Sequence, residues 1–87
     1  MHFSALTLCS LDVEGAELPI LQSIPFDKVD IKVLDIEIKL AGKIFPGTHE
    51  DITNLMLSKG YDLYGYIGDG IDAIYVKNGY LDELNEL

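Results

Sequence analysis

The amino-acid sequence predicts an α/β fold in the order strand, helix, strand, helix, strand, strand. Two short apolar runs, Ala5 to Leu11 and Ile31 to Ile38, are typical of strands covered on both faces of a parallel sheet. The segment between them has the length of a βαβ crossover. Near the end, Tyr61 to Ile67 and Ile71 to Lys77 flank a glycine-rich connection that predicts an antiparallel hairpin. The expected sheet is therefore parallel, with only its last strand pair antiparallel.

The size and charge of the chain limit what it can be. Its 87 residues, 48% of them hydrophobic, suffice for one small core and one domain. The formal net charge of -9 repels polyanions, and the lysines are scattered, so no nucleic-acid partner is expected. Membrane spans need roughly 20 apolar residues, and no run approaches that length. With no signal-peptide pattern at Met1-His2-Phe3, the chain as written reads as soluble and cytoplasmic, although the lone Cys9 leaves the compartment open.

Two prolines define the first predicted helix. Pro19 has no N–H group and is tolerated only in the first turn of a helix, so the helix begins near Ala16 or Glu17. Pro25 prevents it from continuing much beyond Ser23. The helix is thus short and follows the first strand closely.

The middle of the chain predicts a loop and a second helix. Lys39 to Gly47 contains two glycines and a proline, so we expect an irregular, mobile connection. Thr48 can cap the following helix together with Asp51, three residues later. Gly60 ends that helix. Its helically spaced positions are Ile52, Leu55, Met56 and Lys59.

Glycines near the end of the chain are turn residues. No G-x-G-x-x-G motif occurs, and Gly65, Gly68 and Gly70 lie in the predicted hairpin instead of opening a helix. The acidic tail from Tyr80 to Leu87 has weak helical spacing and is too short to hold a helix without packing. We expect this tail to fray.

Three carboxylates cluster where the first strand gives way to the first helix. Asp12, Glu14 and Glu17 have a sufficient structural explanation, because acidic groups stabilise a helix N-terminus and Asp can cap it. The same junction is where open α/β sheets place ligands, and a carboxylate there can act as a general base. Spacing alone favours the structural explanation.

Glu37 is the second candidate site residue. A charge among the apolar positions of a central strand must lie near the strand end or be paired, but it can equally alternate outward between its neighbours. His49 in the first turn of the second helix is more typical of solvated surface. No paired ligands at metal-binding spacing occur, so no metal site is predicted.

The segment that joins the first strand to the first helix also resembles a known family. Residues 9–18 read C-S-L-D-V-E-G-A-E-L, which resembles the D-x-E-G-x-E segment of FkbM-type methyltransferases. An acidic residue on the next strand, a helix, S-K-G-Y and a final D-A-I-Y-V-K strand extend the resemblance from Leu8 to Lys77. It implies the C-terminal half of a Rossmann-like methyltransferase fold, whose sheet ends in an antiparallel strand inserted beside the last parallel ones. The expected domain is residues 1–79, followed by the tail 80–87.

The resemblance implies roles for individual residues. Asp12 and Glu14 match the family's D-x-E pair, near the place where the donor methyl group and the acceptor hydroxyl should meet, and Glu37 matches a position that often carries glutamate. Asp12 and Gly15 would contact the donor, S-adenosylmethionine, since glycine lets the backbone approach closely. The glycine-rich loop and the ribose-binding acidic residue of the family are absent from this sequence. The main donor contacts are therefore expected in an N-terminal half that this chain lacks.

Two functions follow from the resemblance. The first is the C-terminal part of an S-adenosylmethionine-dependent methyltransferase that acts on a hydroxyl of a small molecule or glycan. The second is a non-catalytic, protein-binding relative similar to the Star protein of the secretory pathway, which would need an N-terminal anchor. In either case the first strand opens the chain without an outer neighbour, so we expect dimerisation or aggregation through that edge, or dependence on the missing half.

Overall fold

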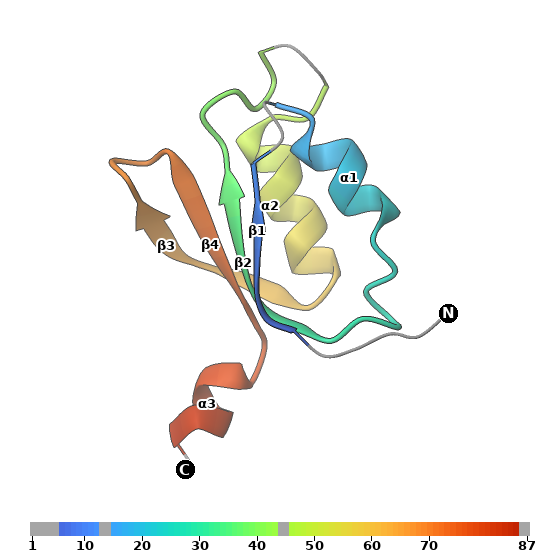
Figure 1. The fold of residues 1–87 in the computed structure, drawn as a ribbon, viewed down its shortest axis with the longest axis vertical. Coiled ribbons are helices and arrows are strands. Elements are labelled where there is room, and N and C mark those ends of the chain that lie inside the picture. Colours follow the sequence, from blue (N-terminus) through green and yellow to red (C-terminus); the bar gives the residue numbers. More distant parts are fainter. Residues whose placement is uncertain (1–5, 13–14, 44–45, 86–87) are drawn as a thin grey trace.

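A computed structural model describes residues 6–12, 15–43 and 46–85, and these residues form an α/β fold with one four-stranded mixed sheet and three helices (Figure 1). Both predicted helices and all four predicted strands are present. The structure adds a short third helix near the C-terminus. In chain order the elements are β1 (Leu6–Leu11), α1 (Glu17–Ser23), β2 (Ile31–Glu37), α2 (His49–Ser58), β3 (Tyr61–Ile67), β4 (Asp72–Lys77) and α3 (Tyr80–Asn85).

The strands lie in the order β1-β2-β4-β3, so the last strand is inserted between β2 and β3. β1 and β2 are parallel, whereas β4 is antiparallel to both of its neighbours. The expectation of a single antiparallel pair was therefore wrong. β4 takes the central place because Ala73, Tyr75 and Val76 are buried, while β3 is largely exposed beyond Tyr61. This arrangement is compatible with part of a Rossmann-like fold.

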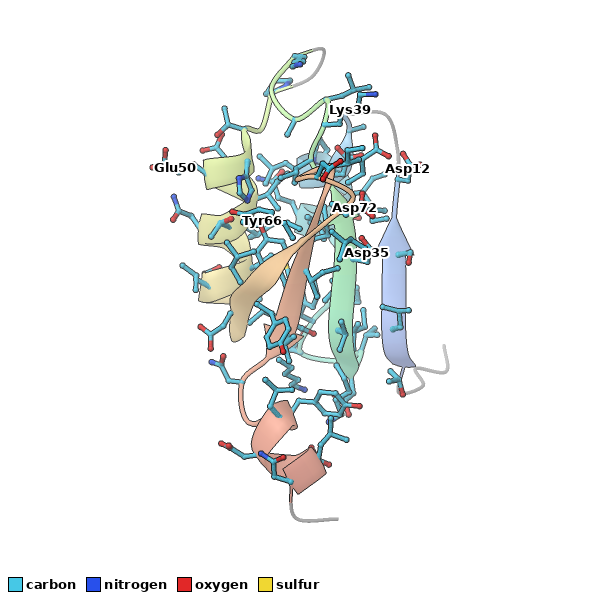
Figure 2. The ribbon with its side chains drawn as sticks, turned by 90° about the vertical axis from the view of Figure 1, so that its left-hand side faces the viewer. Asp12, Asp35, Lys39, Glu50, Tyr66 and Asp72 are labelled. Carbon is cyan, nitrogen blue, oxygen red and sulfur yellow. The ribbon has the colours of Figure 1, made fainter. Side chains whose placement is uncertain are left out.

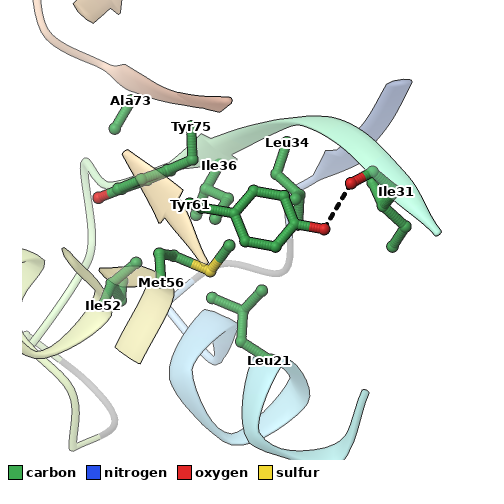
Figure 3. Close-up of a cluster of buried hydrophobic side chains, with 9 residues drawn as sticks. All are labelled: Leu21, Ile31, Leu34, Ile36, Ile52, Met56, Tyr61, Ala73 and Tyr75. Carbon is green, nitrogen blue, oxygen red and sulfur yellow. Dashed lines mark hydrogen bonds between the residues drawn. The ribbon is translucent and has the colours of Figure 1, made fainter. Parts of the chain in front are cut away.

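Helices α1 and α2 pack on the same face of the sheet, and the core lies between them and the strands. Figure 3 shows the side chains of β2 and β4 pointing toward α1 and α2. The Tyr61 hydroxyl donates a hydrogen bond to the carbonyl of Ile31, which ties the start of β3 to the start of β2. Burial raises the pKa of Tyr61 to about 12. The buried cluster consists of Leu21, Ile31, Leu34, Ile36, Ile52, Met56, Tyr61, Ala73 and Tyr75.

The opposite face of the sheet is not covered by α1 or α2. Side chains alternate along a strand, so Leu34 and Ile36 face the helices while Asp35 and Glu37 lie on the other side. Leu8 of β1 is 58% exposed on this uncovered side. We call this surface the open face.

The ends of the two longer helices follow their sequence signals to different degrees. The predicted capping box at α2 is confirmed: Asp51 N–H donates to Thr48 Oγ1 at 3.2 Å, and Thr48 N–H donates to Asp51 Oδ2 at 2.9 Å. At α1 the N-cap is Ala16, whose side chain cannot cap. The first turn of α1 is instead stabilised by the negative charge of Glu17.

The expectation that the C-terminal tail frays was wrong for residues 80–85, which form α3. No residue of α3 is buried, so packing into the core does not hold it. Lys32 of β2 supplies the tertiary contacts that the isolated segment lacks. Its Nζ lies 3.8 Å from Glu83 Oε2 and 5.9 Å from the centre of the Tyr80 ring. The same ammonium also pairs with Asp30 at 3.2 Å.

Candidate functional site

Acidic residues that follow β1, end β2 and begin β4 lie at the same end of the sheet, which we call the acidic edge. Asp12 directly follows β1, and Glu37 is the last residue of β2. Leu11 pairs with Ile36, so the two strands end side by side and bring these carboxylates to the same edge. Asp72, the first residue of β4, pairs with Glu37. The structure therefore brings together Asp12 and Glu37, both candidates from the sequence, at the carboxyl ends of two parallel strands, where α/β sheets bind ligands.

Asp35 adds a carboxyl group on the open face just behind this edge. It pairs with Ser10 of β1 and with Ile74 of β4, which places it diagonally across from Asp72 (Figure 2). Partial burial raises the pKa of Asp35 to about 6, and the protonated carboxyl is further favoured by its hydrogen bond to Asp72 and by that group's charge. Within the part of the chain that the structure describes, Asp35 Oδ1 is buried without a hydrogen-bond partner.

The pair of Asp35 and Asp72 can hold a proton near neutral pH. Two carboxylates in contact cannot both ionise easily, so the pair retains a proton at a pH where an ordinary aspartate has lost it. A carboxyl with a pKa of about 6 can exchange a proton near neutral pH, which suits general acid–base chemistry. Figure 2 shows Asp12, Asp35 and Asp72 on the side of the sheet away from α2.

Helix capping does not explain Asp12. The N-cap position of α1 is occupied by Ala16, four residues after Asp12, and the Asp12 side chain is exposed. Of the structural explanations that the sequence offered for Asp12, the N-cap is thus excluded, and a catalytic role for this residue stays a prediction. Glu14, its partner in the D-x-E pair, lies outside the described residues, and its role stays a prediction.

Gly15 is buried, and the protein's own packing requires its small size. Its φ of +99° is a conformation that residues with side chains rarely adopt. A Cβ at this position would lie 3.0 Å from the carbonyl oxygen of Leu40, in the connection after β2. The loop after β1 thus packs directly on the loop after β2. Contact of Gly15 with a donor stays a prediction, because this internal packing already explains the glycine.

The sequence interpretation missed Asp35, Asp72 and the structural position of Glu17. Asp35 could have been found from the sequence, because it interrupts the same apolar run as Glu37 and, two residues away, points to the same face of the strand. Asp72 could not have been found in this way, because its approach to Asp35 depends on the insertion of β4 beside β2. Glu17 was interpreted only as a charge at the helix start, yet its side chain is 1% exposed.

His49 is less exposed than the sequence suggested. Its ring packs edge-to-face against Tyr66, with 5.6 Å between the ring centres, and its Nε2 is buried without a hydrogen-bond partner among the residues that the structure describes. In the same residues no group of three or more His, Cys, Asp or Glu side chains could hold a metal ion. The candidate site in the described residues therefore consists of carboxylates.

Two clefts lie away from the acidic edge. One, of about 310 Å³, lies between β3, β4 and the start of α3, with Tyr64 and Lys77 among its lining residues. The other, of about 500 Å³, lies beside the end of α1 and includes Phe26 and Lys59. Neither of these two clefts is lined by Asp12, Asp35, Glu37 or Asp72.

Comparison with known proteins identifies one family. The model of the Methyltransferase FkbM domain matches residues 2–63, which include β1, the acidic loop, β2 and α2. No curated protein and no solved structure matches the chain. Among the described residues, no helix has the length and apolar character needed to cross a membrane.

Proposed function

The chain belongs to the FkbM methyltransferase family, and we propose that it is the C-terminal part of an S-adenosylmethionine-dependent methyltransferase that methylates a hydroxyl group of a small molecule or glycan. In this proposal residues 1–79 are part of the catalytic domain, the C-terminal half of a Rossmann-like methyltransferase fold, and residues 80–87 follow it. The observation that carries the proposal is the convergence of carboxylates at the ends of β1 and β2, inside the segment that matches the family.

The acidic edge suits the charge of the donor. The donor supplies an activated methyl group on a positively charged sulfur, and a surface carrying Asp12, Glu37 and Asp72 attracts a cation. Asp12 and Gly15 would contribute to donor binding from the loop after β1. The remaining donor contacts would come from the preceding half of the domain.

Methyl transfer to oxygen requires alignment and a proton acceptor. The acceptor oxygen forms a bond to the methyl carbon as the carbon–sulfur bond breaks, and the hydroxyl proton passes to a carboxylate. Asp12 and Glu14 are the candidates from the family motif, with Glu37 beside them. Asp35 joins them as a proton acceptor, because its raised pKa matches proton transfer near neutral pH.

Calorimetric titration with S-adenosylmethionine tests where the donor site lies. We expect no saturable heat with residues 1–87 alone, because the main donor contacts would be in the preceding half. A longer chain that includes that half should bind the donor. Saturable binding by residues 1–87 would contradict this division of the site.

Asp12→Asn in a longer, active chain tests the role of the motif. Asn keeps the size and the hydrogen-bonding oxygen of Asp but cannot accept the proton, so we expect a large loss of kcat with little change in thermal stability. Asp27→Asn, in an exposed loop between α1 and β2, is the matched control and should leave both unchanged. A fully active Asp12→Asn enzyme would remove this residue from the mechanism.

The Star-like alternative gains no specific support, since no described contact marks a protein-binding surface and no curated relative matches. Transfer of labelled methyl from the donor to a hydroxyl would establish the enzyme. Donor binding without transfer to any of a panel of glycans and small alcohols would favour the non-catalytic alternative.

A further inference from the structure

Glu17 is the one residue with a charged side chain among the fully buried positions of the described structure. Its side chain is 1% exposed, although Glu17 lies only two residues after Gly15 and is the first residue of α1. Burying a carboxylate is unfavourable unless the group makes compensating polar contacts. An exposed acidic residue would serve the helix dipole equally well, so the charge at the helix start does not explain the burial.

The carboxylate contacts the backbone of the loop that precedes it. Gly15 N–H donates a hydrogen bond to Glu17 Oε2 at 3.3 Å, and this hydrogen bond is buried. Gly15 is itself buried and has a φ of +99°, so the loop turns sharply at the point that Glu17 contacts. Glu17, at the start of α1, therefore holds the Gly15 backbone through this hydrogen bond.

The Gly15 backbone also packs against the connection that follows β2. The Gly15 backbone packs so closely on Leu40 that a Cβ would lie 3.0 Å from the Leu40 carbonyl oxygen. Farther along that connection, a Cβ on Gly47 would lie 2.5 Å from Leu18 Cβ, on the residue next to Glu17. The Gly15 backbone is therefore fixed between a buried carboxylate and a neighbouring loop.

We infer that Glu17 is a positioning residue, which fixes the backbone of Gly15 before α1 and so limits where Asp12, three residues earlier in the chain, lies at the carboxyl end of β1. The hydrogen bond and its effect on the loop do not depend on any activity. Only the consequence for catalysis by Asp12 rests on the proposed function.

Two substitutions separate the hydrogen bond from the packing. Glu17→Gln keeps the shape and an oxygen that can accept from Gly15. Glu17→Met fills a similar volume without an acceptor, so it removes the hydrogen bond to the Gly15 N–H while keeping most of the packing. If Glu17 had only a packing role, both variants would change the protection of all backbone amides together.

Hydrogen exchange of assigned amides in residues 1–87, followed by NMR, tests the inference. We expect Glu17→Gln to leave the exchange rate of the Gly15 amide near that of the unmodified chain, and Glu17→Met to raise it about tenfold relative to the Leu34 amide in β2. The Gly15 amide proton should also shift upfield only in the Met variant.

An unchanged Gly15 exchange rate in Glu17→Met, measured against Leu34, would overturn the inference. So would equal loss of protection in the Gln and Met variants, because that result would assign Glu17 to packing or charge and not to the hydrogen bond. Failure of the proposed function has a different signature, since a longer chain would then show no methyl transfer whatever the Gly15 exchange rate.

Discussion

Asp35→Asn should stabilise the protein at neutral pH and reduce its dependence on pH. Asp35 has a pKa near 3.8 when unfolded and of about 6 when folded. The folded state therefore binds the proton more tightly, and the stability that this contributes is complete below the unfolded pKa and is lost as the pH rises to the folded value. Asn cannot ionise, so the variant avoids this loss between about pH 4 and pH 6.

The magnitude follows from the size of the shift. One pKa unit corresponds to about 1.4 kcal/mol, so a shift from 3.8 to about 6 corresponds to roughly 3 kcal/mol as an upper limit. Asp35 is only partly buried and shares its proton with Asp72, and solvent screening reduces the effect. We expect a gain of about 1–2 kcal/mol in the free energy of unfolding at pH 7 and almost none at pH 3.5.

Urea unfolding between pH 3.5 and 7.5, followed by circular dichroism, measures this gain. Asp72→Asn should give a smaller gain, because it removes the charge beside Asp35 but leaves the burial of Asp35, the largest cause of the raised pKa, in place. Asp27→Asn, in an exposed loop, should not change the slope of stability against pH. The reasoning is refuted if Asp35→Asn destabilises the protein at pH 7, or keeps the slope of the unmodified chain.

Three further substitutions test the fold. Gly47→Ala should lower the free energy of unfolding by about 2–3 kcal/mol, because the new Cβ would meet Leu18 at 2.5 Å and φ is +120°. Tyr61→Phe should lower it by about 1–2 kcal/mol, because the Ile31 carbonyl loses its buried donor. Light scattering should show residues 1–87 self-associating through the outer edge of β1, and Leu8→Lys should shift them toward monomer, because an edge charge opposes strand pairing.

Each of these substitutions has a matched control. Gly60→Ala meets no atom within 4 Å at a φ of +89° and should lower stability by only about 1 kcal/mol. Tyr64→Phe, at a residue that is 68% exposed, should have almost no effect. Leu57→Lys places the same charge on α2 and should leave self-association unchanged. A monodisperse monomer from the unmodified chain would contradict the edge proposal.

Proline and helix-capping residues predicted the bounds of the first two helices from the sequence alone. Pro19 lies in the first turn of α1 and Pro25 follows its end, and the structure places α1 at Glu17–Ser23. The Thr48–Asp51 capping box begins α2 as predicted. These signals act over a few residues, so tertiary contacts seldom override them. The family was also readable, because the D-x-E-G-x-E segment is contiguous and lies within the matched residues 2–63.

The sequence by itself thus determined the family and the bounds of most helices and strands, whereas only the tertiary structure decided which charged groups meet. Asp35 and Asp72 are far apart in the chain and come together because β4 inserts beside β2. Glu17 is buried although it begins a helix, and near it Gly15 approaches Leu40 and Gly47 approaches Leu18. Strand order, burial and pKa depend on neighbours in space, and a periodic pattern records only which face a residue occupies and not what it faces.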